Sequence, residues 1–168
     1  MKTLKRRSQK QEKSVAKDFN AKVTVASGAK WGMKADVRND KFLIECKTTE
    51  KDYYTLTSTV WEKIEQEAIR DHLRIPLMVI DLEDKDRVVV FNPKDFDPVN
   101  RLGTYVPHLL TVPKSIRVRA DMLGYDSFGN YHHMLLTSIR GKTKNYTICL
   151  MLQKDFEEEY KEELFSGT

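Results

Sequence analysis

Residues 34–49 read KADVRNDKFLIECKTT, a stretch in which two β-forming runs flank the turn residues Asn39 and Asp40. The pattern predicts a β-hairpin whose second strand begins with the apolar run 42–44. Apolar residues at this density are more typical of an internal strand than of an exposed edge strand. The hairpin therefore predicts a sheet with a buried core around it.

The faces of this hairpin follow from the alternation of side chains along a strand. If the turn contains an even number of residues, Asp36 lies opposite Leu43, and residues directly opposite each other share a face. Leu43, Glu45 and Lys47 also share a face because side chains alternate with a period of two. The hairpin thus predicts two carboxylates and one ammonium on the same side of the sheet.

A helix is expected over residues 9–19, before the hairpin. Ser8 and Gln11 match a capping box, in which two side chains satisfy backbone amides at a helix start. Glu12 lies three and four residues from the apolar stripe of this helix, and therefore on its inward face. A carboxylate on that face needs a partner.

A second helix and further strands are expected after the hairpin. Thr59 and Glu62 match another capping box, and apolar residues recur at helical spacing until about residue 73. The remaining strands are predicted at 23–25, 77–80, 87–91, 116–120, 132–138 and 146–152, with a closing helix over 155–165. The predicted fold class is α/β: an α-β-β-β-α-β core in a mixed sheet flanked by helices, then a β-rich extension and the closing helix.

Composition excludes several classes of protein. The 168 residues carry 29 Lys and Arg against 25 Asp and Glu, a formal charge of +4, and 40% of them are hydrophobic, enough for a single domain. We expect a core over 1–96 and an extension of unassigned role over 97–168. No apolar run approaches the roughly 20 residues of a membrane span, and no apolar segment follows the charged N-terminus, so a cytoplasmic protein without a membrane partner is expected. Cys46 and Cys149 exclude a disulfide framework and favour two buried thiols over one bridge.

Positive charge is concentrated at the start of the chain. Residues 1–17 hold seven Lys or Arg against one Glu, whereas residues 154–163 hold two Lys against six acidic residues. A basic terminus favours a polyanionic partner, although such a run is also typical of a solubilising tail. The candidate phosphate contacts are Lys5, Arg6, Arg7, Lys10, Lys34, Thr48 and Thr49. The two threonines are equally typical of residues that end a strand. A second phosphate surface, or alternatively a solvated face, is formed by Arg117, Arg119, Arg140, Lys142 and Lys144.

The carboxylates of the hairpin are a candidate metal site. Asp36 and Glu45 repel each other unless a cation neutralises them, and Mg²⁺ accepts one or two carboxylates together with water and substrate phosphate. Lys47 would then stand beside the metal-bound water, where it can orient that water or help it lose a proton. The alternative is a solvated sheet face with a weak cross-strand ion pair.

The order of these features resembles the PD-(D/E)xK nuclease superfamily, and most closely its Holliday junction resolvase branch of archaeal and phage type. The resemblance extends from residue 8 to about residue 92. It is carried by Glu12, Ser27-Gly28-Ala29, Lys34-Ala35-Asp36 and Ile44-Glu45-Cys46-Lys47-Thr48-Thr49. Ala35 departs from the pattern, since the family usually has Pro or Gly there.

The resemblance implies a role for each matching residue. Asp36, Glu45 and the backbone carbonyl of Cys46 would bind Mg²⁺, for which Mn²⁺ would substitute, and Lys47 would act on the water. Glu12 matches a helical glutamate that assists the metal or its waters, and Ser27 matches a loop serine near the scissile phosphate. The fold implied is the restriction-endonuclease-like α/β core.

The predicted function is that of a Mg²⁺-dependent, structure-selective DNA endonuclease, a Holliday junction resolvase that acts as a homodimer on branched or duplex DNA. Such an enzyme would serve DNA recombination or repair in a prokaryotic or phage-infected cell. Two alternatives stay open. One is a restriction or repair endonuclease of the same chemistry that cuts linear duplex DNA, and the other is a non-catalytic DNA-binding module with this fold.

Overall fold

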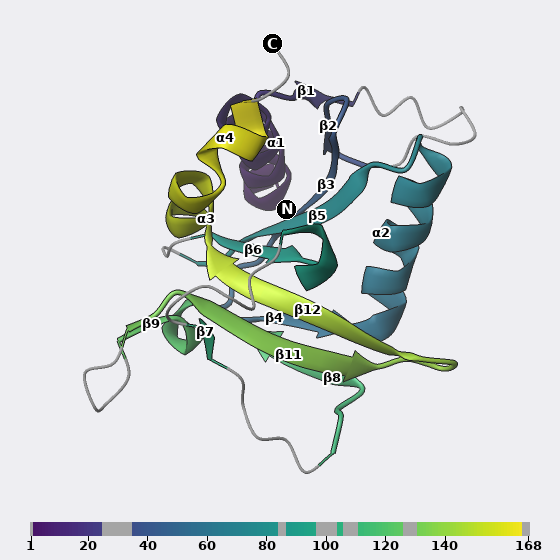
Figure 1. The fold of residues 1–168 in the computed structure, drawn as a ribbon. Helices are drawn as coiled ribbons and strands as arrows, with labels where there is room; N and C mark the ends of the chain where they lie inside the picture. Colours follow the sequence, from purple (N-terminus) through teal and green to yellow (C-terminus); the bar gives the residue numbers. More distant parts are fainter. Residues whose placement is uncertain are drawn as a thin grey trace.

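In a computed structural model, the chain folds around a large mixed sheet that lies between two layers (Figure 1). The structure describes residues 2–24, 35–83, 87–96, 104–105, 111–125 and 131–165. Within these residues the sheet has eight strands in the order β1-β2-β3-β5-β6-β12-β11-β7. Their bounds are β1 Lys22–Val23, β2 Val37–Arg38, β3 Phe42–Thr48, β5 Ile75–Asp81, β6 Val88–Phe91, β7 Thr104–Tyr105, β11 Met134–Arg140 and β12 Asn145–Leu152.

Different elements cover the two faces of this sheet (Figure 1). One face packs against the helices α1 (Lys2–Asp18), α3 (Gln153–Glu159) and α4 (Lys161–Phe165). The other face packs against α2 (Ser58–Arg70) and a two-stranded ribbon of β4 (Tyr54–Thr57) and β8 (Ser115–Val118). The short elements are η1 Pro93–Asp95, η3 Ala120–Met122, β9 Gly124–Tyr125 and β10 Tyr131–His132.

Strand β3 lies inside the sheet, as its apolar sequence predicts. It pairs antiparallel with β2 on one side and parallel with β5 on the other, and the crossover between β3 and β5 contains α2. Phe42, Ile44 and Cys46 face the layer of α1, while Leu43 faces the layer of α2. Because a strand alternates its side chains, the polar residues that follow Leu43 on the same face lie on the side of α2.

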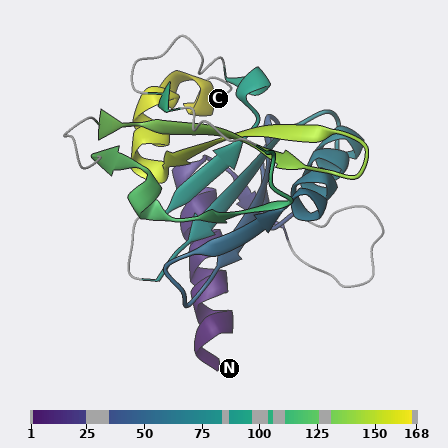
Figure 2. The same ribbon diagram turned by 90° about the horizontal axis from the view of Figure 1, so that it is seen from below.

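The first helix begins at Lys2, earlier than the predicted start at residue 9, so the capping box at Ser8 is wrong. Lys and Arg are good helix formers, and their run extends α1 beyond the edge of the sheet (Figure 2). Ser8 lies inside the helix, where its hydroxyl donates to Glu12 Oε1 at 3.1 Å. Gln11 is buried against the sheet.

Two other helix boundaries differ from prediction. Thr57 caps α2, since its Oγ1 accepts a hydrogen bond from the Val60 amide at 3.4 Å, and the predicted cap at Thr59 lies inside the helix. The closing helix is broken into α3 and α4 at Tyr160, which is fully buried among phenylalanine rings. The Tyr160 hydroxyl donates to the Phe96 carbonyl at 3.2 Å. This long-range packing interrupts the helix where its local sequence would continue it.

Residues beyond 96 contribute strands to the main sheet. β12 pairs antiparallel with β6 and β11 pairs with β12, so the extension continues the sheet that the hairpin begins. Cys46 and Cys149 are both buried and free, which confirms the prediction of two buried thiols. Among the helices described here, none is long and apolar enough to cross a membrane.

Candidate functional site

The turn of the β2–β3 hairpin lies one residue later in the chain than predicted. Asn39 Oδ1 accepts hydrogen bonds from the amides of Lys41 at 2.9 Å and Phe42 at 2.7 Å, and the Asn39 amide donates to the Phe42 carbonyl at 3.1 Å. Arg38 therefore lies opposite Leu43, the position predicted for Asp36. The expected register is wrong by two residues.

A shift of two residues leaves every side chain on its predicted face, because the alternation has a period of two. Val37 pairs with Ile44, so the next position along the hairpin brings Asp36 beside Glu45. The two carboxylates are thus closer than the predicted register would place them. Lys47 follows Glu45 on the same face of β3.

Asp36 is held by the backbone of the neighbouring strand. Its Oδ2 accepts a hydrogen bond from the Cys46 amide at 2.9 Å. Burial and the negative charges of Glu45 and Glu12 raise the pKa of Asp36 from 3.8 to about 6, against the opposing effects of the Cys46 amide and the Lys47 ammonium. Two further carboxylates therefore act on Asp36 at this end of β3.

Lys47 forms an ion pair with Glu45. Its Nζ lies 2.6 Å from Glu45 Oε1, and the two side chains are 32% and 14% exposed. Burial by itself would lower the pKa of Lys47, but the hydrogen bond and charge of Glu45, with Tyr54 and Asp36, raise it. The Lys47 ammonium is thus kept charged and held beside the carboxylates.

The Cys46 carbonyl faces the edge of β3 on which Asp36 lies. The Thr49 amide, just past β3, donates to the Asp81 carbonyl of β5 at 3.0 Å, so alternate residues direct their backbone groups toward β5. Cys46 is an odd number of residues away from Thr49, so its backbone groups point to the opposite edge of β3, and its amide donates to Asp36. Amide and carbonyl of one strand residue point to the same edge of the strand, which brings the Cys46 carbonyl toward the carboxylates.

This donor set fits a hard divalent cation. Oxygen ligands from one or two carboxylates and a backbone carbonyl are what Mg²⁺ accepts, with water completing its octahedron. In the part of the chain that the structure describes, no group of three or more His, Cys, Asp or Glu side chains could hold a metal ion. A Mg²⁺ site here would therefore use Asp36, Glu45 and the Cys46 carbonyl, and take its other oxygens from water and substrate.

Tyr54, the first residue of β4, is a further neighbour of this site. Burial raises the pKa of its phenol, the Lys47 charge lowers it and the Glu45 charge raises it again, so the phenol lies close to both groups. β4, which carries Tyr54, pairs with β8 of the extension. The β4–β8 pairing joins segments far apart in the sequence, so no local pattern places Tyr54 beside Lys47 and Glu45.

The other predicted residues are distributed around the site. Glu12 lies on α1, and its charge acts on Asp36. Thr48 donates its hydroxyl to Gln11 Oε1 at 2.6 Å, on the face opposite Lys47, and Thr49 Oγ1 accepts from the Lys51 amide at 3.1 Å. The basic candidates Lys5, Arg6 and Lys10 are exposed on α1, and Arg7 is half-buried. Ser27 and Lys34 lie outside the described residues.

Comparisons with known proteins find a similarity among solved structures only. No family model matches the chain, and no curated protein matches it. Among solved structures the chain is similar to Hjc of Archaeoglobus fulgidus, a Holliday junction resolvase from an archaeal hyperthermophile. The two are 12% identical with a TM-score of 0.43, and the alignment covers 67% of this chain and 88% of that one.

Proposed function

We propose that the chain is a Mg²⁺-dependent DNA endonuclease whose reaction centre is formed by Asp36, Glu45 and Lys47. The observation that carries this proposal is the meeting of two carboxylates and one ammonium on a single sheet face, with the pKa of Asp36 raised to about 6. A carboxylate with a raised pKa weakens the fold at neutral pH, and a divalent cation would reverse that effect. Strongly perturbed groups of this kind are typical of functional sites.

Each residue has a role in the proposed hydrolysis of a phosphodiester. A divalent ion, when bound by Asp36, Glu45 and the Cys46 carbonyl, supplies Lewis-acid polarisation and an acidified water, and Mn²⁺ should replace Mg²⁺. Lys47 holds positive charge where negative charge develops on the attacked phosphate, and Glu45 fixes its ammonium. Glu12, held through Ser8, can accept a hydrogen bond from a water near Asp36.

For the substrate we propose branched DNA, a four-way junction cut by a homodimer. Two identical sites related by a twofold axis would suit paired cuts across a junction with the same symmetry. Exposed cations along α1 support a polyanionic partner. A linear-duplex nuclease would share the same reaction centre and differ in the surface that selects the DNA.

The experiment compares a labelled four-way junction with a linear duplex built from the same arms, each incubated with the protein and Mg²⁺. Symmetric nicks in the junction alone are expected, and they should be lost in Lys47→Met. Lys63→Met is the matched control, because Lys63 is a 61% exposed lysine on α2. Cleavage of the linear duplex at an equal rate would replace the resolvase by a duplex endonuclease.

Removing a carboxylate should separate binding from cleavage. Asp36→Ala and Glu45→Ala are expected to lower cleavage at least about a hundredfold while junction binding stays within about threefold, since the basic phosphate contacts remain. Gel-shift titration in EDTA and single-turnover cleavage in Mg²⁺ measure the two quantities. Binding by the wild type with no cleavage in Mg²⁺ or Mn²⁺ would contradict the enzyme and favour the non-catalytic DNA-binding module.

A further inference from the structure

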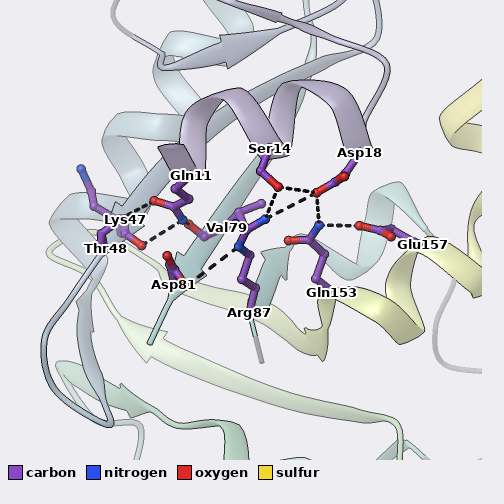
Figure 3. Close-up of polar contacts among 10 residues, drawn as sticks. All are labelled: Gln11, Ser14, Asp18, Lys47, Thr48, Val79, Asp81, Arg87, Gln153 and Glu157. Atoms are coloured by element: carbon purple, nitrogen blue, oxygen red, sulfur yellow. Dashed lines mark hydrogen bonds and ion pairs between the residues drawn. The ribbon is translucent and has the colours of Figure 1, made fainter. Parts of the chain in front are cut away.

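Gln11 is a polar residue on the buried face of α1. Its side chain is 1% exposed, and it lies on the same helix stripe as the fully buried Val15 and Phe19. Figure 3 shows the Gln11 amide reaching from α1 to the end of β3, where the reaction centre lies on the opposite face. An amide at a stripe position otherwise filled by apolar side chains needs a reason.

The Gln11 amide connects three strand positions. Its Nε2 donates to the carbonyls of Lys47 at 3.1 Å and Val79 at 3.0 Å. Its Oε1 accepts the Thr48 hydroxyl at 2.6 Å. Both amide hydrogens and the amide oxygen are therefore used, and they join α1 to β3 and β5 at the residue that carries the ammonium of the site.

We propose that Gln11 is a positioning residue that fixes Lys47 for the reaction, an inference that rests on the proposed function. The Lys47 carbonyl is held from the α1 side while its side chain leaves toward Glu45 on the other side. Holding the backbone at this point sets the direction in which the side chain leaves. Glu12 is the next residue of α1, so the same contact keeps it in register with the site.

The chemistry of the contact favours positioning over packing. An apolar residue of similar size would fill the space between α1 and the sheet, as Val15 does one turn later. Such a residue would leave the Thr48 hydroxyl without its acceptor, a loss that an apolar residue at 48 would remove because replacing both partners is close to neutral. The Lys47 and Val79 carbonyls would lose the Gln11 donor but keep their places in the ladder between β3 and β5, so their loss costs little stability. Stability and positioning can therefore be separated by mutation.

The test uses single and double variants of the full chain. Gln11→Met should lower both the melting temperature and kcat, whereas Gln11→Met with Thr48→Val should recover the melting temperature and leave kcat about tenfold below that of Thr48→Val. KM for the DNA should change less than twofold. A double variant with the kcat of Thr48→Val would overturn the proposal.

Gln153→Met is the matched control for a buried glutamine. The Gln153 amide is 7% exposed and donates to Asp18 Oδ2 at 3.0 Å and to Glu157, so it joins α3 to α1 without touching Lys47 (Figure 3). The Gln153→Met variant should have a lower melting temperature and an unchanged kcat. A kcat that followed the melting temperature in both glutamine variants would show that Gln11 is only structural.

A second readout needs neither metal nor cleavage. Relaxation of the labelled Lys47 Cε–Nζ group in metal-free protein measures how firmly the ammonium is held. The order parameter should fall in Gln11→Met and in the double variant, and stay at the wild-type value in Gln153→Met. If the wild type cleaves no DNA, the proposed function fails, but this measurement still tests whether Gln11 positions Lys47. An order parameter that is unchanged in the double variant would overturn the positioning role of Gln11.

Discussion

Asp36 makes the folded chain less stable at neutral pH than at acidic pH. Its pKa is raised from 3.8 to about 6, first by burial and then by Glu45. Between about pH 4 and pH 6 the folded chain keeps a proton that the unfolded chain has released, so this contribution to stability is lost as the pH rises. Converting the whole pKa shift of Asp36 into free energy of unfolding gives about 3 kcal/mol. Solvent screening at a half-buried carboxylate reduces this contribution to about 1–2 kcal/mol.

Asp36→Asn should therefore stabilise the metal-free protein at pH 7 by about 1–2 kcal/mol and have little effect at pH 4. The amide oxygen can still accept the Cys46 hydrogen bond, so the change removes charge rather than a contact. Urea unfolding in EDTA at the two pH values measures the difference. Asp52→Asn, at an exposed carboxylate after β3, is the control and should be neutral at both. A destabilised Asp36→Asn at pH 7 would contradict the expectation.

At the scale of elements, one arginine joins α1 to two strands (Figure 3). Arg87 Nη1 donates to Ser14 Oγ at 3.1 Å and Asp18 Oδ2 at 3.4 Å, and its Nε lies 3.9 Å from Asp81 Oδ1. Asp18 also accepts from Gln153 at the start of α3. The Arg87 charge is therefore shared by two carboxylates from separate elements.

Arg87→Met should lower the free energy of unfolding by about 1–3 kcal/mol, because it leaves Asp18 and Asp81 partly buried without their shared cation. Met keeps most of the apolar part of the arginine side chain, so the loss of stability measures the contribution of the guanidinium group. The reference is Lys63→Met, which removes an exposed ion pair with Glu67 at 3.9 Å and should cost at most about 0.5 kcal/mol. Equal losses in urea unfolding would show that the network adds nothing beyond a surface pair.

Elements with a local cause were predictable from the sequence. The alternation of β3 put Asp36 and Glu45 on one face, and that result survived a register wrong by two residues because parity alone decides the face. Gln11 was assigned to a capping box, although its place on the apolar stripe of α1 was the signal of burial. The break at Tyr160 and the β4–β8 pairing depend on contacts with distant parts of the chain, which no local pattern encodes.

At the scale of the whole molecule, α1 presents a row of cations to solvent. Arg6, Lys10, Lys13 and Lys17 are all exposed and follow each other at spacings of four, three and four residues, which places them on one face of the helix. The buried residues of α1, among them Val15, lie on the opposite face. Figure 2 shows the N-terminal end of α1 projecting from the body of the molecule. Under the proposed function we expect bound DNA to run along this helix, which also carries Glu12.

Replacing Arg6, Lys10 and Lys13 by Gln should weaken DNA binding and reduce the slope of log K against log salt by about 2–3, because each phosphate contact releases counterions. The same change in charge at Arg140, Lys142 and Lys144, in and after the end of β11, is the matched control and should change the slope by less than about 1. Fluorescence anisotropy with a labelled junction in EDTA, over a series of salt concentrations, measures both variants without cleavage. Equal slopes in the two triple variants would mean that net charge alone attracts the DNA. A larger reduction of the slope in the variant of Arg140, Lys142 and Lys144 would place the DNA-binding surface at the turn between β11 and β12 instead of along α1.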